Sequence, residues 1–150
     1  SPAKVKRQVV GVFDKKLLKI FAEALKNLNL KKAIIVNSQD GLDEISPYAN
    51  TSIVELSNKK VKETILNPND LGIKADKFEN IVGKGPDYNS EKMKEIFQGK
   101  DNDFSIAVCL NAAAGLIVAD ESSSSKEGYT KLRDHILSGK VMAHMLKLQS

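Results

Sequence analysis

Asp43 and Glu44, two adjacent carboxylates, are the residues of this 150-residue chain whose types and spacing best suit chemistry. They lie in a polar, glycine-containing stretch, residues 37–47, which directly follows a short apolar run. Two neighbouring carboxylates on a loop can turn toward one hard cation, and Mg²⁺ takes one or two protein carboxylates together with water and phosphate oxygens. The same pair also suits an ordinary solvated turn. From the residues alone, a magnesium site and a plain turn both stay open.

Other polar features suit chemistry less well. His135 and His144 belong to two different predicted helices and have no third ligand at metal spacing, so we expect surface or interior histidines and not zinc ligands. Residues 83–86 resemble a phosphate loop only superficially, because a P-loop opens a helix directly after a buried strand, and we predict a turn there. Asn111 lies in an apolar stretch, where a buried amide must find partners, so we predict a hydrogen-bonded core asparagine.

The elements that precede and follow the loop predict the fold class. Residues 8–13 form an almost wholly apolar run, which is typical of a strand buried on both faces in a parallel sheet. Asp14 is a plausible N-cap for the amphipathic helix that comes next, and residues 33–36 form a second buried strand. The apolar stripe predicted for this helix consists of Leu17, Leu18, Ile20, Phe21, Leu25 and Leu28. Strand, helix and strand make a right-handed βαβ unit, so we predict an α/β fold.

Beyond the loop, the sequence predicts a hairpin and then helices. Residues 51–56 and 61–66 are strand-like runs around a turn, which indicates an antiparallel hairpin added to the sheet. A short amphipathic helix should cover residues 87–98, and residues 104–119 are apolar nearly all round, as in a buried helix. Two last helices should follow a surface serine tract in which Ser125 is a candidate cap. We expect Met93, Cys109, Met142 and Met145 to lie in the core.

Composition predicts one globular unit without a membrane segment. With 41% hydrophobic residues, the chain can bury a single core. The longest apolar run falls short of the roughly 20 residues that a membrane-spanning helix needs, and the amino terminus does not resemble a signal peptide. The single cysteine excludes an internal disulfide and fits a reducing compartment. We therefore expect a cytoplasmic protein with no membrane partner.

The net charge of +4 raises the alternative of nucleic-acid binding. The basic excess is uneven, because residues 1–32 carry nine lysines or arginines against two acidic residues. Four of the lysines, Lys15, Lys16, Lys19 and Lys26, fall largely on the polar face of the first predicted helix, and no aromatic residues are interleaved for base stacking. We expect no nucleic-acid partner, although a basic module stays the last of the alternatives.

Three stretches, taken together and in order, resemble the anthranilate phosphoribosyltransferase family. Residues 2–13 resemble the stretch that follows the family's Gly-Pro-Leu-Thr-Asn turn. Residues 40–46, Asp-Gly-Leu-Asp-Glu-Ile-Ser, resemble its metal-binding loop, and residues 110–114, Leu-Asn-Ala-Ala-Ala, resemble a buried helix near its end. The resemblance covers essentially the whole chain, including the intervening hairpin.

The resemblance implies both a fold and an activity. The fold would be a partial parallel sheet with an added antiparallel hairpin, flanked by helices, corresponding to part of the large domain of a phosphoribosyltransferase with a nucleoside phosphorylase-like fold. The activity would be transfer of the phosphoribosyl group of 5-phosphoribosyl 1-pyrophosphate to anthranilate, with release of diphosphate, in tryptophan biosynthesis. The residues that match the family's carboxylates, Asp43 and Glu44, would help to hold Mg²⁺ near the diphosphate.

The chain also departs from the family. No segment matches the glycine-rich Gly-Thr-Gly-Gly-Asp loop, the anthranilate-binding arginine or the helical small domain that forms the family's dimer interface. We therefore expect residues 1–150 to be the carboxyl-terminal part of the α/β domain, without catalytic residues or an identifiable substrate-binding residue of its own. Its partners would be the missing amino-terminal portion and, for the complete enzyme, a second copy. By itself the chain should be inactive.

Two further alternatives stay open. A related nucleoside phosphorylase would share the α/β architecture but not the Asp-Gly-Leu-Asp-Glu loop. A noncatalytic binding or regulatory module could have lost the phosphate loop altogether.

Overall fold

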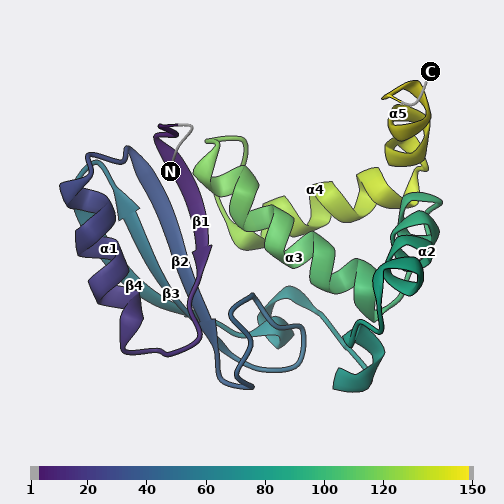
Figure 1. Ribbon diagram of the computed structural model, residues 1–150, viewed down its shortest axis with the longest axis horizontal. Helices are drawn as coiled ribbons and strands as arrows, with labels where there is room; N and C mark the ends of the chain where they lie inside the picture. The colour runs from purple at the N-terminus through teal and green to yellow at the C-terminus, as the bar shows by residue number, and fades with distance from the viewer. Residues whose placement is uncertain (1–3, 149–150) are drawn as a thin grey trace.

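The computed structural model describes residues 4–148, which form a four-stranded sheet and five α-helices (Figure 1). The strands are β1 (Arg7–Gly11), β2 (Lys32–Ser38), β3 (Thr51–Ser57) and β4 (Lys60–Leu66). The α-helices are α1 (Leu17–Asn27), α2 (Pro86–Phe97), α3 (Asp103–Val118), α4 (Ser125–Leu137) and α5 (Lys140–Leu148), and two 3₁₀ turns are η1 (Pro68–Leu71) and η2 (Phe78–Ile81).

The sheet is mixed and follows chain order, β1-β2-β3-β4. β1 pairs with β2 in parallel, with Val9 opposite Ile34, and α1 makes the crossover between them, so the predicted βαβ unit is confirmed. β2 pairs with β3, and β3 with β4, in antiparallel fashion, which confirms the predicted hairpin. The sheet therefore joins one parallel pair to an antiparallel meander, as the α/β prediction required.

Strand β2 is buried on both faces because a helical layer covers each side of the sheet. Ala33 and Ile35 belong to the core beneath α1, whereas Ile34 and Val36 belong to the core beneath α3 and α4. Each of these four side chains is at most 3% exposed. In Figure 1, α1 lies on one side of the sheet and α3 on the other, with α2 and α5 beyond α3 and away from the sheet. Alternate residues of a strand point to opposite faces, so β2 holds both cores together.

Two sequence predictions about the first strand and helix are wrong. β1 is an edge strand, so Val9 is 39% exposed instead of buried on both faces. In α1 the buried stripe is Leu18, Ala22 and Leu25, while Ile20, Phe21 and Leu28 are 61%, 38% and 64% exposed. The helix has two neighbouring apolar flanks, and in the described chain only one of them meets the sheet.

The predicted cap of α1 is also wrong. Asp14 lies one turn ahead of the helix, where its carboxylate accepts a hydrogen bond of 2.8 Å from the backbone N–H of Lys16. The helix itself begins at Leu17, and its first N–H donates to the carbonyl of Asp14 at 2.9 Å. Asp14 therefore shapes the turn that leads into α1 and does not cap it.

The helical layer is built around α3, which packs on α4 as well as on the sheet. A capping box starts α3, because the side chain of Asn102 accepts from Ser105 N–H at 3.0 Å while Ser105 Oγ accepts from Asn102 N–H at 3.0 Å. Cys109 is 1% exposed between α3 and its neighbours, which confirms its predicted place in the core. Burial raises the pKa of its thiol to about 11.

Three smaller predictions about the helices need correction. The cap of α4 is Ser124, whose hydroxyl accepts from Glu127 N–H at 3.2 Å, and not Ser125. The methionines predicted for the core are not buried: Met93 is 45% exposed, because α2 buries only Ile96, and Met142 and Met145 are half-buried, because α5 buries no side chain fully. Residues 83–85 are irregular instead of the predicted turn, and they lead into α2 after the 3₁₀ turn η2 and not after a buried strand.

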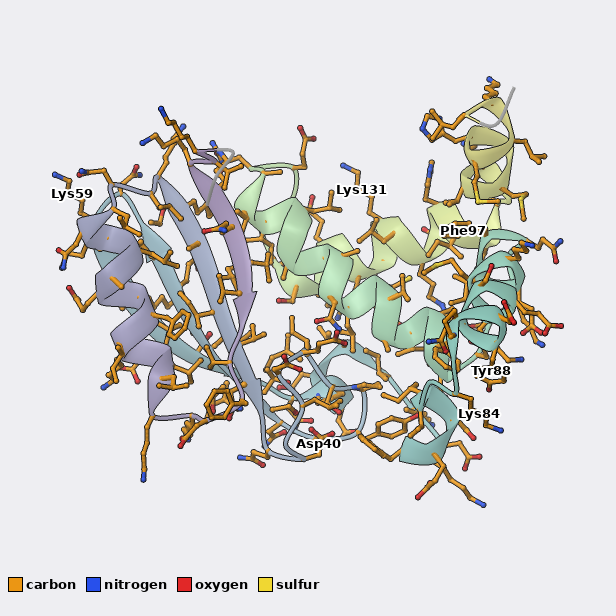
Figure 2. All side chains as sticks on the ribbon, in the orientation of Figure 1. Asp40, Lys59, Lys84, Tyr88, Phe97 and Lys131 are labelled. Atoms are coloured by element: carbon orange, nitrogen blue, oxygen red, sulfur yellow. The ribbon has the colours of Figure 1, made fainter. Side chains whose placement is uncertain are left out.

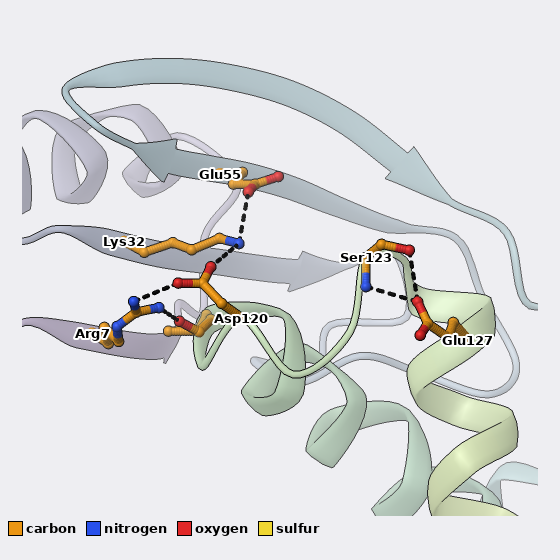
Figure 3. A network of polar contacts seen from close by, with 7 residues as sticks. Arg7, Lys32, Glu55, Asp120, Ser123 and Glu127 are labelled. Atoms are coloured by element: carbon orange, nitrogen blue, oxygen red, sulfur yellow. Dashed lines mark hydrogen bonds and ion pairs between the residues drawn. The ribbon is translucent and has the colours of Figure 1, made fainter.

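Ion pairs fasten the carboxyl end of α3 to the first two strands (Figure 3). Arg7 of β1 donates to the carboxylate of Asp120 and to the carbonyl of Val118. Lys32 of β2 lies 3.2 Å from the same carboxylate and 3.8 Å from that of Glu55. Arg7 above all, and Lys32 beside it, lower the pKa of Asp120 to about 2. Opposite charges therefore close the gap between the sheet and the end of α3.

Within residues 4–148, no helix is both long enough and apolar enough to span a bilayer.

Replacing Asp120 by Asn should lower the melting temperature of the chain by a few degrees at neutral pH. Because the pKa of this carboxyl is lowered from 3.8 to about 2 in the folded chain, its contribution is complete above 3.8 and is lost as the pH falls toward 2. The difference between the variant and the wild type should therefore disappear across that range. Thermal unfolding followed by circular dichroism at several pH values measures this.

Asp134→Asn is the matched control. Asp134 is exposed on α4 and forms no ion pair with the sheet, so this substitution removes the same charge without breaking such a pair. A pH-independent difference for Asp120→Asn, or an equal one for the control, would contradict the role assigned to the Arg7 and Lys32 pairs.

Candidate metal site in the loop after β2

The loop that carries the predicted metal ligands, residues 39–50, leaves the carboxyl end of β2 and returns to β3. Backbone hydrogen bonds close it at its base, from Ser38 N–H to the carbonyl of Leu42 at 2.9 Å and from Gln39 N–H to the carbonyl of Asn50 at 2.9 Å. Figure 2 shows Asp40 in this loop, whereas Lys84 and Tyr88 lie at the start of α2. The loop is therefore a compact extension of the sheet, at the end of a parallel strand where ligands bind in α/β folds.

The end of β1 lies directly against the loop. A Cβ atom on Gly11 would lie 1.7 Å from the carbonyl oxygen of Asp43, which is closer than two non-bonded atoms can approach. Next to it, Val12 N–H donates to the carbonyl of Val36 at 3.0 Å, and Asn37 Nδ2 donates to the carbonyl of Val12 at 2.8 Å. Glycine at position 11 therefore allows the backbone at Asp43 to rest on β1.

A buried polar cluster supports the loop from within. Ser46 and Thr51 are both 0% exposed, and Ser46 N–H donates to Thr51 Oγ1 at 3.2 Å. The hydroxyl of Ser46 donates to the carboxylate of Asp40 and accepts from Tyr48 N–H at 3.0 Å. Asp40 is therefore engaged in holding the shape of the loop, which leaves the other two carboxylates to face solvent.

Helix α3 holds the loop at two points. The side chain of Asn111 accepts from Ile45 N–H at 2.9 Å and donates to the carbonyl of Ile45 at 2.9 Å, so the predicted hydrogen-bonded asparagine is confirmed. At the start of the helix, the hydroxyl of Tyr48 donates to Asp103 at 2.9 Å. The Tyr48–Asp103 contact could not be predicted from the sequence, because its partners lie 55 residues apart and neither stands in a recognisable motif.

Asp103 gathers further donors around itself. Asn80 Nδ2 donates to its carboxylate at 2.8 Å, and the backbone N–H of Asp76 donates at 3.2 Å. Burial acts to raise the pKa of Asp103, but hydrogen bonds from Asn80 and Tyr48 outweigh it, so the pKa is lowered. Burial and this carboxylate together raise the pKa of Tyr48. Asp103 is thus an ionised structural anchor that ties η2 and the loop to α3.

Asp43 and Glu44 differ from these anchored carboxylates. Both side chains are exposed, and within residues 4–148 no donor or cation contacts either carboxylate. No third histidine, cysteine or acidic side chain of the described residues joins them in a metal-binding cluster. Two free carboxylates fit Mg²⁺ better than zinc, because Mg²⁺ keeps several waters and shares phosphate oxygens with a substrate. The pair suits such an ion, with other ligands supplied by water and substrate.

The other sequence candidates lie elsewhere. His135 on α4 and His144 on α5 are exposed, in line with one of the two predicted environments, the protein surface. Several basic residues near the amino terminus are paired within the chain, among them Lys19 with Glu63 at 2.9 Å and Lys26 with Glu23 at 3.3 Å. These pairs reduce the free positive charge that a nucleic acid would meet.

The fold and the loop after β2 are those of an α/β domain of the glycosyl transferase type. Residues 1–142 match the model of the glycosyl transferase family, a/b domain, and the chain belongs to that family. Within it, the chain is similar to anthranilate phosphoribosyltransferase of Pelagibacter ubique, at 56% identity over all 150 residues, which is 46% of that protein. It is 36% identical to the Clostridium kluyveri enzyme over 95% of this chain and 43% of that protein. The chain thus spans less than half the length of these relatives.

Solved structures agree with the sequence relatives. Anthranilate phosphoribosyltransferase from Thermus thermophilus superimposes with a TM-score of 0.79 at 29% identity, over 89% of this chain and 39% of that one. The Saccharomyces cerevisiae enzyme in complex with 4-fluoroanthranilate gives 0.81 at 26% identity, over 91% of this chain and 40% of that one. A yeast variant with Mg bound gives the same TM-score at 26% identity, over 91% and 40% of the two chains. The predicted fold class, part of the large domain of such an enzyme, is confirmed.

Replacing Gly11 by Ala should destabilise the chain by about 2–3 kcal/mol or more, because the new methyl group must displace the backbone at Asp43. Replacing Gly115 by Ala is the control: outside its own helix no atom lies within 4 Å of a Cβ there, and alanine in the last turn of α3 should change stability by less than about 1 kcal/mol, in the stabilising direction. Urea unfolding of both variants measures these changes. Equal effects of the two substitutions would contradict the close packing of β1 on the loop.

Proposed function

We propose that this chain is the carboxyl-terminal part of the α/β domain of an anthranilate phosphoribosyltransferase of tryptophan biosynthesis. The observation that carries the proposal is the 56% identity over all 150 residues to an enzyme of that name. The exposed Asp43–Glu44 pair at the end of β2 supports it, since both carboxylates are free to receive a cation. In the complete protein, 5-phosphoribosyl 1-pyrophosphate and anthranilate would be the substrates, and Mg²⁺ the metal.

The proposed chemistry gives the two carboxylates a defined role. The amino group of anthranilate forms a bond to C1 of the ribose as the bond from C1 to the diphosphate breaks, so negative charge grows on the leaving diphosphate. Mg²⁺, when bound, would stabilise that charge. Asp43 and Glu44 would hold the ion without touching the reacting carbon, and thus no residue of this chain is assigned as catalytic. The residues that bind anthranilate and cradle the diphosphate would lie outside this chain.

One surface of the chain suits the missing portion. β1 leaves one side of its backbone unpaired at the sheet edge, and beside it Phe13, Phe21 and Leu28 are 82%, 38% and 64% exposed. The opposite edge, β4, also exposes Val61 and Ile65, but it alternates them with charged side chains, the kind of charge that protects a true sheet edge. These charged residues are Lys60, Lys62 and Glu63. We therefore assign the β1 edge and the outer flank of α1 as the attachment surface for the amino-terminal portion of the same protein.

The remaining parts of the proposal follow from the enzyme class. The complete protein would act in the cytoplasm, and it would form a homodimer through a helical domain that this chain lacks. A noncatalytic module stays the alternative, and reconstitution separates the two.

The chain alone should not transfer phosphoribosyl groups, but mixed with the complementary portion of the Pelagibacter ubique enzyme it should. The expected signal is Mg²⁺-dependent loss of anthranilate fluorescence in the presence of 5-phosphoribosyl 1-pyrophosphate. Phe21→Asp should reduce reconstitution because it places a charge on the attachment surface, whereas Val61→Asp on the β4 edge should not. Folded components that bind each other and remain inactive would favour the noncatalytic module.

In the reconstituted enzyme, Asp43→Ala with Glu44→Ala should lower turnover by about 10- to 100-fold at limiting Mg²⁺. Stability should change little, because exposed loop carboxylates without partners contribute little to folding. Glu121→Ala with Asp134→Ala removes two exposed charges far from the loop and should leave turnover unchanged. Unchanged Mg²⁺ dependence in the first double variant would refute the metal assignment.

A further inference from the structure

The Asp43–Glu44 pair lies between two fixed points of the backbone, and each point belongs to a different layer of the fold. On one side, the carbonyl of Asp43 rests on Gly11 of β1, where no side chain could fit. On the other, Ile45 is 2% exposed, and its side chain is part of the core that α3 shares with β2. The exposed carboxylates are therefore attached to an unusually well-defined stretch of backbone.

Asn111 completes the second fixed point. Its amide forms a two-way pair with Ile45, in which Oδ1 accepts from the N–H and Nδ2 donates to the carbonyl, both at 2.9 Å. A third hydrogen bond, from Nδ2 to the carbonyl of Ala107 at 3.0 Å, holds the side chain against its own helix. Only the observed orientation of the amide satisfies all three partners, since carbonyls accept and an N–H donates.

The pairing acts on the peptide that joins Glu44 to Ile45. The N–H from which Asn111 accepts belongs to that peptide, so α3 sets the plane of the peptide. Together with the carbonyl of Asp43, which rests on Gly11, this plane sets the direction of the Cα–Cβ bond of Glu44. A free loop would have to lose conformational entropy when a cation binds, whereas a loop that is already held does not. Groups that orient the direct ligands of a metal commonly change its affinity by about 10- to 100-fold.

We propose that Asn111 is a positioning residue, which fixes the Glu44–Ile45 peptide so that the carboxylates of Asp43 and Glu44 are oriented for a divalent cation before it binds. This inference rests on the proposed function and adds a residue, on another element, through which the metal affinity is set. Asn111 touches neither metal nor substrate in this role; it acts only through Ile45.

The first test concerns the hydrogen bonds themselves and uses this chain alone. In Asn111→Ala the amide of Ile45 should exchange with solvent at least about 10-fold faster than in the wild type, as measured by NMR. Ser122→Ala is the matched control: it removes a hydrogen bond of 2.9 Å from another mostly buried side chain, between α3 and α4, and should leave Ile45 unchanged. Unchanged exchange at Ile45 in Asn111→Ala would overturn the proposal.

The second test concerns the metal and uses the reconstituted enzyme, with Mn²⁺ as the probe in the presence of 5-phosphoribosyl 1-pyrophosphate. Electron paramagnetic resonance should show Mn²⁺ binding about 10-fold weaker in Asn111→Ala, and activity should recover at saturating Mg²⁺. A purely structural role would lower the active fraction without changing the Mg²⁺ requirement. Asn111→Asp keeps the volume and the acceptor but loses the donor, so it should show the same defect if the alanine variant fails to fold.

The outcomes separate this inference from the proposed function. Loss of Mn²⁺ binding in Asp43→Ala with Glu44→Ala, together with wild-type binding in Asn111→Ala, would overturn the positioning role alone. Wild-type binding in the double variant would overturn the metal assignment and the positioning role together. Weaker binding in Asn111→Ala, with an unaffected Ser122→Ala control, supports both.

Discussion

Burial of β2 on both faces is the constraint from which the rest of the architecture follows. A strand with apolar side chains on both faces must be covered by a layer on each side. Here α1 covers Ala33 and Ile35, while α3 covers Ile34 and Val36. The loop that leaves β2 therefore emerges where both layers end. It can touch β1 and α3 at once, which is why an exposed pair of carboxylates can have a rigid backbone beneath it.

Acidic residues near the candidate site and at the end of α3 have two different physical roles. Asp40, Asp103 and Asp120 each accept hydrogen bonds, and they fix a loop, a helix start and a helix end. Asp43 and Glu44 have no such partners among residues 4–148. Carboxylates that accept hydrogen bonds from the protein stabilise the fold. Two adjacent carboxylates without partners instead repel each other and attract a cation. Asp43 and Glu44 therefore place two unpaired carboxylates next to each other in the loop after β2.

Local patterns were sufficient to predict the order of strands and helices, because each depends on residues close in sequence. They could not tell which flank of α1 would be covered, since Phe21 and Leu28 fit an apolar stripe as well as the truly buried residues do. The cap at Ser124 was missed by one position in a run of identical residues. The Asp43–Glu44 pair was predicted as a metal site through its motif, but the partner of Asn111 lies 66 residues away and follows only from the folded chain.

The buried sulfur of Cys109 has a consequence for the chemical behaviour of the chain. Its pKa of about 11 leaves almost no thiolate at neutral pH, and thiolate is the form that reacts with alkylating agents and oxidants. As the single cysteine of the sequence, it makes the native chain inert to such reagents. Reaction at this sulfur requires α3 to separate from its neighbours, so the rate of labelling reports how often the core opens. A cysteine introduced at the surface would be labelled while Cys109 stays unreacted.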